Sequence, residues 1–251
     1  METCVSVREC QPSGKSRDLR DAPLSRVPRG VAFENSAVAV WLIPLEVSAR
    51  QLQQCTKLLC SAEQLRIDRL QFERDRHSHT IAQGMLRVLL GEHLAIPPAA
   101  VEIELGQYGK PALASPHEST HFNLSHTTDF ALCAISRTCV PGVDIEYLDR
   151  DIDHDGLARK YFSTREQAEF QRIPASARKH AFLTCWTRKE AVAKATGQGL
   201  HLPLRDIEVN IDPDAPPQLL SLPAMPVSGW TLHTIDAGNL YAATVALRPA
   251  G

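Results

Sequence analysis

The sequence predicts an α+β protein whose strands pair in antiparallel sheets. Long helical segments with an apolar face are separated by groups of short strands, and the strands follow one another through tight turns rather than helical crossovers. The order is strand, helices and strands, and then helices and strands again, although no strong sequence repeat accompanies it. The 251 residues suffice for one large or two small domains with a sizeable core.

Residues 1–37 are predicted to form a disordered tail, because they are rich in Ser, Pro, Gly and charge and show no sustained period. They lack the apolar core of a signal peptide, and their alternating charges disfavour a transit peptide. A start codon assigned too early is a second interpretation of this segment.

The first half of the ordered chain is predicted to contain two helices and four strands. Ile81, Met85 and Leu89 recur every fourth residue in the longer helix, which ends before a pair of prolines. Pro44, which cannot donate to a sheet ladder, either limits a strand over 37–47 or places that strand at an edge. The expected helices cover residues 48–66 and about 72–94, and the further strands cover 101–105, 121–124 and 130–136.

In the second half, residues 130–136 and 140–146 are predicted to pair as an antiparallel hairpin. Arg137–Cys139 would form the turn, and Gly142 fits a tight turn of this kind. The other expected elements are helices over 157–162, 164–172 and 175–196 and strands over 207–211, 218–222, 230–235 and 241–246.

Composition excludes several classes of protein. The net charge of −2 gives no basic field for nucleic acid or membrane surfaces, and no apolar run approaches the roughly 18–20 residues that span a bilayer. Seven cysteines without a CxxC pair indicate reduced thiols rather than disulfides or zinc ligands. We therefore expect a cytoplasmic, monomeric protein with no nucleic acid or membrane partner.

Two groups of polar residues stand out. Trp186, Glu190 and Lys194 form a stripe on one face of the helix over 175–196, which a glycine-rich turn ends. Asp144 and Glu146 lie two residues apart on a strand and therefore share a face. Each pattern alone is also typical of a solvated surface. Three carboxylates beside a lysine indicate a divalent cation that holds a phosphate group.

A turn and a strand end add further candidates. Ser125 and His126 are either a capping pair or hydrogen-bond donors to phosphate. Adjacent strand residues point to opposite faces, which disfavours a Ser–His nucleophile pair. Lys110, between Gly109 and Pro111, is either an exposed turn lysine or a fixed point charge for a phosphate.

Five motifs in order resemble the Sfp-type 4′-phosphopantetheinyl transferases: YGKP, FNLSH, GVDIE, YFSTRE and WTRKEAVAKATGQGL. The resemblance runs from about residue 38 to 245 and is most specific between residues 109 and 200. It implies two similar α+β halves related by pseudo-two-fold symmetry, with coenzyme A between them. The first half, 38–137, would contact the nucleotide. The second, 138–247, would hold magnesium and dock the carrier protein.

The resemblance also implies roles for single residues. Asp144, Glu146 and Glu190 match magnesium ligands, and Lys194 matches the lysine at the coenzyme A pyrophosphate. Glu166, in the FSTRE stretch, matches a glutamate with a supporting role. Basic residues expected near the 3′-phosphate are Arg66 and Arg69, with His79 standing where relatives often have a small hydroxyl residue or arginine. The remaining matches to coenzyme A contacts are Lys110, Pro111, Ser125, His126 and Asp144.

The implied reaction transfers 4′-phosphopantetheine from coenzyme A to a serine of an apo acyl or peptidyl carrier protein, and 3′,5′-ADP leaves. Glu190 and Lys194 are the expected catalytic residues; the base is either Glu190 or a magnesium-bound water. One alternative is a catalytically silent relative that only binds coenzyme A or a carrier. Another, an unrelated magnesium-dependent phosphoryl or nucleotidyl transferase, is disfavoured because no GxxxxGK[ST] loop occurs. The sequence leaves open which carrier protein is served.

Overall fold

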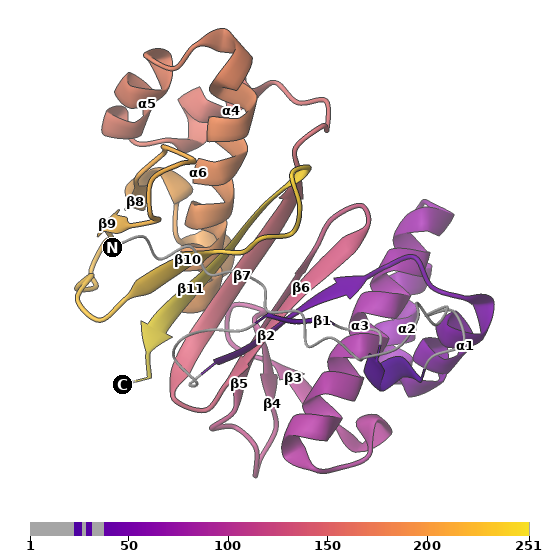
Figure 1. Ribbon diagram of the computed structural model, residues 1–251. Helices are drawn as coiled ribbons and strands as arrows, with labels where there is room; N and C mark the ends of the chain where they lie inside the picture. The colour runs from indigo at the N-terminus through magenta and orange to yellow at the C-terminus, as the bar shows by residue number, and fades with distance from the viewer. Residues whose placement is uncertain (1–22, 27–28, 32–37, 251) are drawn as a thin grey trace, which may run out of the picture.

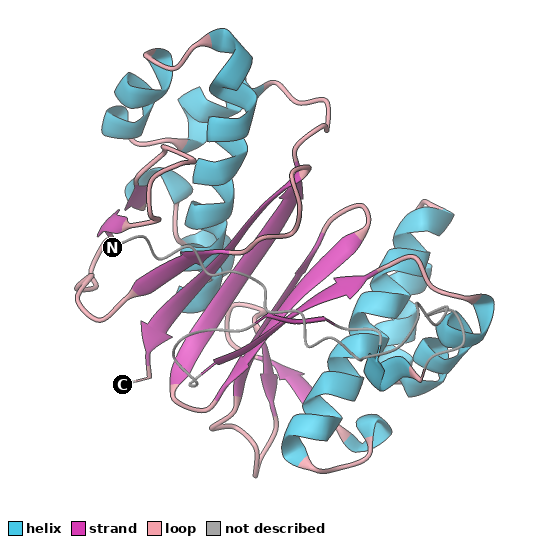
Figure 2. Ribbon diagram, viewed as in Figure 1, coloured by secondary structure: helices cyan, strands magenta, loops and turns pink. Residues whose placement is uncertain are grey.

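The computed structural model describes residues 23–26, 29–31 and 38–250 and has the α+β architecture that the sequence predicts. Strands occupy the middle of the molecule, and two groups of helices lie on either side of them (Figures 1 and 2). The described α-helices are α1 (Ala49–Leu58), α2 (Ser61–Asp68), α3 (Glu73–Leu94), α4 (His154–Tyr161), α5 (Thr164–Gln171) and α6 (Ala175–Thr196).

The strands form two larger antiparallel sheets and two small hairpins. The sheet orders are β1-β2-β6-β5 and β10-β11-β7, and the hairpins are β3-β4 and β8-β9. The strands are β1 (Arg29–Val31), β2 (Val38–Pro44), β3 (Ile103–Leu105), β4 (Pro111–Leu113), β5 (His121–His126), β6 (Phe130–Ser136), β7 (Cys139–Tyr147), β8 (Glu208–Val209), β9 (Leu219–Ser221), β10 (Thr231–Thr234) and β11 (Tyr241–Pro249).

The two halves of the chain repeat one topology. In each, a strand is followed by helices that include one of 22 residues, then by a small hairpin and two strands. The strand order β2-β6-β5 in the first half corresponds to β7-β11-β10 in the second. This repeat agrees with the expected pair of similar halves. The proposed boundary between residues 137 and 138 falls in the short link between β6 and β7.

Three apolar clusters explain the layering. Ile43 and Ile135 pack with α3, and Ala246 packs with α6. Val40 and Val143 belong to a third cluster, in which residues from both larger sheets meet. Because strand side chains alternate between faces, each sheet covers a helix with one face and packs in the shared cluster with the other.

The single helix expected over residues 48–66 is wrong, because the chain breaks into α1 and α2. Leu59 and Cys60 have extended backbones between the two helices. The Glu63 carboxylate accepts a hydrogen bond from the Cys60 N–H at 2.8 Å and pairs with Arg87 of α3 at 2.9 Å. The break therefore lets Glu63 start a new helix and fasten it to α3.

The hairpin expected between residues 130–136 and 140–146 is also wrong. β6 pairs with β2 and β5, whereas β7 pairs with β11. The Ser136 hydroxyl accepts hydrogen bonds from the Thr138 and Cys139 N–H groups, at 3.1 and 3.2 Å. This local turn sends the chain from one sheet into the other.

Gly142 has a different role from the one expected. It lies inside β7 rather than in a turn, opposite Ala246 of β11. A Cβ atom at this position would lie 2.0 Å from the carbonyl oxygen of Ala191 in α6. The glycine therefore permits the close approach of α6 to β7.

The predicted tail over residues 1–37 is described only at residues 23–26 and 29–31. Leu24–Arg26 forms a 3₁₀ turn, and Leu24 packs against the cluster beneath α3. Arg29–Val31 is β1 and pairs with β2. These residues are therefore structured, contrary to expectation, and the rest of the predicted tail lies outside the described residues. Within the part that the structure describes, no helix has the length and apolar character to cross a membrane.

Candidate functional site

The candidate site lies where β5, β7 and α6 meet. β7 is the last strand of its sheet, so the backbone of Val143 needs partners beyond that sheet. The Asn123 side chain of β5 accepts from the Val143 N–H at 2.8 Å, and Lys194 of α6 donates to the Val143 carbonyl at 3.0 Å. Side chains from both halves of the chain therefore hold this strand edge.

Asp144 is the centre of the site. Its Oδ1 atom lies 2.6 Å from Lys194 Nζ and accepts a hydrogen bond of 2.9 Å from the Ser125 hydroxyl. Lys194 Nζ also donates to Ser125 Oγ at 3.0 Å. The Asp144 side chain is only 7% exposed, and its Oδ2 atom has no hydrogen-bond partner among the described residues. A buried carboxylate oxygen without a partner is costly, so Oδ2 has hydrogen-bonding capacity that the described residues leave unused.

Glu146 and Glu190 supply two further carboxylates. The Arg150 guanidinium donates a short hydrogen bond to Glu146. Burial and Asp144 raise the pKa of Glu146, and Arg150 acts in the opposite direction. Burial and then Asp144 raise the pKa of Glu190 to about 7 against the opposing effect of Lys194, and Glu146 raises it further. The sequence prediction that these acidic groups lie near Lys194 agrees with these interactions.

The donor chemistry fits a hard divalent cation, because carboxylate oxygens are its usual ligands and Asp144 Oδ2 is free. In the described part of the chain, however, no three His, Cys, Asp or Glu side chains are grouped as a metal site. Lys194 is bound to Asp144 and Arg150 is bound to Glu146 in this conformation. The chain's own cations thus occupy oxygens that a metal would use.

Lys110 belongs to the first half of the chain and contacts α6 of the second half at the site. It follows Gly109, whose φ of +79° shapes the turn before β4, and Pro111 begins that strand on the surface. Lys110 Nζ donates to the carbonyl of Lys194 at 2.8 Å, at the C-terminal end of α6. Burial and then Arg248 lower the pKa of Lys110 to about 8. A cation at this helix end also stabilises the helix dipole.

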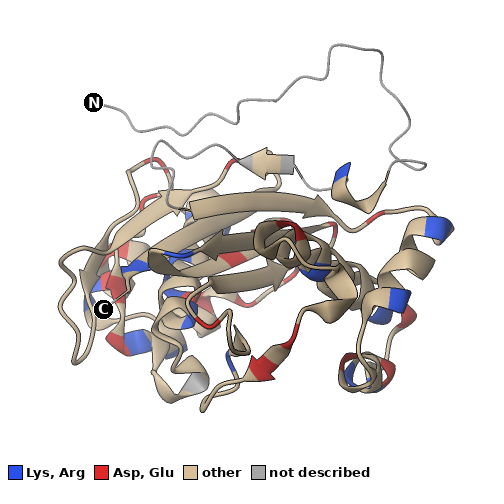
Figure 3. Ribbon diagram, turned by 90° about the horizontal axis from the view of Figure 1, so that it is seen from below, with Lys and Arg blue, Asp and Glu red and all other residues tan. Residues whose placement is uncertain are grey.

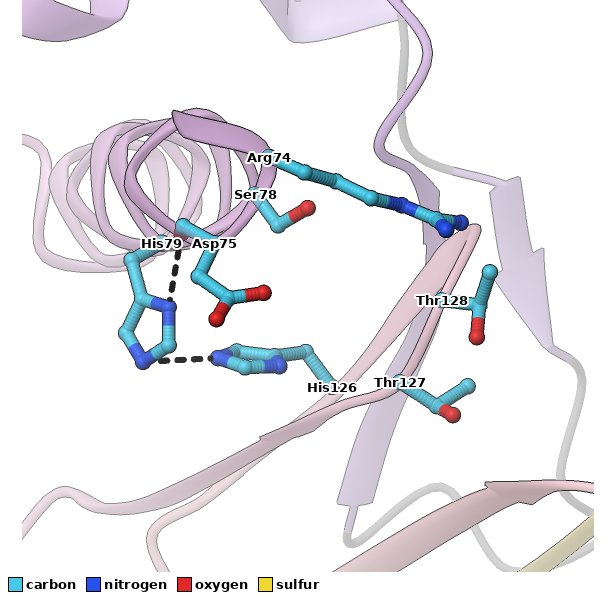
Figure 4. Close-up of a pocket in the computed structure, with 7 residues that line it drawn as sticks. All are labelled: Arg74, Asp75, Ser78, His79, His126, Thr127 and Thr128. Carbon is cyan, nitrogen blue, oxygen red and sulfur yellow. Dashed lines mark hydrogen bonds between the residues drawn. The ribbon is translucent and has the colours of Figure 1, made fainter. Parts of the chain in front are cut away.

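His79 and His126 form a second cluster beside the site. Their Nε2 atoms are 3.2 Å apart, and Figure 4 shows the ring of His79 on α3 directed toward that of His126 at the end of β5. Burial and then His79 lower the pKa of His126 to about 4. Ser125 points to Asp144 instead, so the prediction that Ser125 and His126 face opposite sides is confirmed.

A cavity of about 220 Å³ adjoins the two histidines. Its basic lining residue is Arg74 rather than Arg66 or Arg69. Arg66 is exposed on α2, and Arg69 is exposed at the C-terminal end of that helix. The structure therefore does not bring these two arginines into the cavity beside His79. No sequence pattern singled out Arg74, although it lies five residues before His79 in the same predicted helix.

Glu166 belongs to the core rather than to the site surface. One of its oxygens accepts from Lys189 Nζ and from the Ser163 N–H, and the other accepts from the Val209 N–H at 2.9 Å. Ser163 and Glu166 form a capping box at the start of α5. These contacts give Glu166 a structural function; the supporting role in the reaction stays a prediction.

The fold and this cluster define a class of protein, an α+β protein of two similar halves with an acidic, lysine-bearing site between them. Residues 141–246 match the family model of the 4′-phosphopantetheinyl transferase superfamily. Residues 46–138 match a model described as 4′-phosphopantetheinyl transferase, N-terminal. The N-terminal match ends in the short link between β6 and β7, and the superfamily match begins within β7.

Among curated relatives, the 4′-phosphopantetheinyl transferase HetI of Nostoc sp. is 34% identical over 226 residues, which are 89% of this chain and 93% of the relative. A 4′-phosphopantetheinyl transferase of Bacillus subtilis is 29% identical over 58% of this chain and 63% of its own length. The 4′-phosphopantetheinyl transferase Sfp of Bacillus subtilis is 25% identical over the same shares. This chain belongs to the 4′-phosphopantetheinyl transferase superfamily, and the predicted family and enzyme class are confirmed.

Proposed function

We propose that this enzyme transfers 4′-phosphopantetheine from coenzyme A to a serine of an apo acyl or peptidyl carrier protein and releases 3′,5′-ADP. The observation that supports the proposal most is the Asp144–Lys194–Ser125 cluster, which combines a cation with a buried unpartnered carboxylate oxygen. Family membership supplies the type of reaction. The proposal includes that the enzyme is a cytoplasmic monomer. It leaves open which pathway the carrier protein serves.

Asp144, Glu146 and Glu190 would hold a magnesium ion in the active complex. Their oxygens are the donor type that magnesium prefers, and Asp144 Oδ2 is free to bind it. Bound magnesium would neutralise negative charge that develops on the diphosphate.

The chain's own residues would orient coenzyme A and move the proton. Lys194, already directed into the site by Asp144, would bind the diphosphate. Ser125 and His126 would contact the nucleotide from β5, together with Lys110 and Pro111 at the start of β4. His79 is the proposed residue near the 3′-phosphate, whereas Arg66 and Arg69 are exposed and lie outside the cavity that His79 lines.

Glu190 is the proposed base for the carrier serine. A neutral hydroxyl is a weak nucleophile and needs an acceptor for its proton. Without bound metal, burial and then Asp144 raise the pKa of Glu190 to about 7, so this carboxyl group takes up a proton near neutral pH. Magnesium at the same carboxylate would lower that pKa.

The test is transfer to a carrier protein. Purified enzyme, coenzyme A and magnesium should add one phosphopantetheine group to an apo-carrier, measured as an increase in intact mass. A carrier with its acceptor serine replaced by alanine is the control and should gain no mass. If acyl and peptidyl carriers of several kinds all remain unmodified, the proposed function is wrong and a silent binding protein is the better interpretation.

A further inference from the structure

Two positive side chains pair with two carboxylates of the cluster. Lys194 contacts Asp144 Oδ1 at 2.6 Å, and Arg150 donates to Glu146. Asp144 and Glu146 lie two residues apart on β7 and therefore share a face, so the two cations act on adjoining carboxylates. Nothing in the proposed reaction uses Arg150.

Arg150 lies beside the carboxylate cluster and contacts it through Glu146. It follows the end of β7, four residues after Glu146, and its side chain is 43% exposed, whereas that of Glu146 is 15% exposed. The guanidinium therefore covers Glu146 from the solvent side. Lys194 reaches Asp144 from α6, and its contacts with the Val143 carbonyl and Ser125 fix its position.

A divalent cation that enters this cluster must compete with both internal cations. It would have to share or displace the contacts at Asp144 and Glu146, and like charges at short distance repel strongly where water is partly excluded. A diphosphate changes this balance, because its oxygens attract Lys194 and the metal alike.

We propose that Arg150 and Lys194 are internal counter-ions that weaken binding of a free divalent cation, so that metal and diphosphate bind cooperatively. The inference rests on the proposed function, because it assigns the three carboxylates to the metal. On this proposal, Arg150 is one of the residues that set the affinity for the metal. The enzyme without coenzyme A would therefore bind a divalent cation weakly.

The test measures binding of Mn²⁺ by electron paramagnetic resonance, with and without coenzyme A. Arg150→Gln should bind free Mn²⁺ about three- to tenfold more tightly than wild type, because one opposing charge is removed. Lys194→Gln should increase the affinity at least as much. Arg165→Gln is the matched control, since Arg165 also pairs with a glutamate four positions away, at 3.0 Å on α5, and should leave Mn²⁺ affinity unchanged.

Coenzyme A should raise the Mn²⁺ affinity of wild type, and the gain should be smaller in Lys194→Gln. Equal or weaker Mn²⁺ binding by both Arg150→Gln and Lys194→Gln would overturn the counter-ion proposal while leaving the transferase function intact. If wild type and all variants fail to bind Mn²⁺ even with coenzyme A, the proposed metal site is itself wrong. Transfer to a carrier, measured separately, distinguishes that result from failure of the proposed function.

Discussion

Helix α6 carries two lysine–carboxylate pairs that differ in exposure and in how completely the carboxylate is hydrogen-bonded. Lys189 pairs with Glu166 in the core, where the two side chains are 0% and 1% exposed. Lys194, five residues later, pairs with Asp144, and these side chains are 29% and 7% exposed. Both oxygens of Glu166 have partners, whereas one oxygen of Asp144 has none among the described residues.

The difference separates a structural ion pair from a functional one. Lys189 donates both to Glu166 and to the Ile207 carbonyl, so α5, α6 and the segment before β8 are joined by a fully satisfied network. The Lys194 pair leaves hydrogen-bonding capacity unused at a place where two halves of the chain meet. A ligand, rather than the fold, would complete it.

The largest expected effect on stability is at the core pair. Glu166→Gln removes the charge that balances Lys189 and should lower the free energy of unfolding by about 3–5 kcal/mol. Chemical denaturation would measure the change. The control is Glu169→Gln, which removes an exposed partner of Arg165 on the same helix and should have little effect. Equal stability of Glu166→Gln and wild type would remove the distinction between the two pairs.

A smaller and pH-dependent effect is expected at Glu190. Its pKa of about 7 in the folded chain lies above the ordinary value of 4.5, so the folded state binds the proton more tightly than the unfolded state. Without metal, the stability that this proton provides should be lost as pH rises from about 4.5 to about 7. Glu190→Gln cannot lose a proton, and its melting temperature should therefore rise relative to wild type over this window.

Glu102→Gln, at an exposed position before β3, is the control for that comparison and should show no such trend. A constant difference in melting temperature between Glu190→Gln and wild type from pH 4.5 to pH 7 would contradict the raised pKa. Measurements with magnesium and coenzyme A should reverse the trend, since the bound ion favours the charged carboxylate.

Periodic patterns predicted much of the fold and site. The four-residue spacing in α3 and α6 and the two-residue spacing of Asp144 and Glu146 are local, and tertiary packing preserved them. The structure thus agrees with the expected stripe of Glu190 and Lys194 and with the common face of the two carboxylates. Figure 3 shows basic and acidic positions interspersed along the described part of the chain.

The errors concern contacts between distant segments. The partner of β7 is β11, about a hundred residues away, and no local pattern distinguishes this pairing from a hairpin with β6. In the sequence, Gly142 has the character of a turn glycine. Its actual role depends on the contact with Ala191 of α6, which the local sequence does not show. The contact between Arg150 and Glu146 was not predicted for a related reason. A spacing of four residues predicts a side-chain contact in a helix but not across the end of a strand.

Asp144→Asn tests the central distinction most directly, by measuring melting temperature and carrier modification in the same preparation. Asparagine keeps the size of the side chain and can still accept from Ser125 and Lys194, but it removes the free anionic oxygen. We predict a melting temperature close to that of wild type and a transfer rate lower by about a hundredfold or more. A variant that transfers at the normal rate, or that loses stability as Glu166→Gln is expected to, would contradict the assignment of the Asp144–Lys194 pair to function.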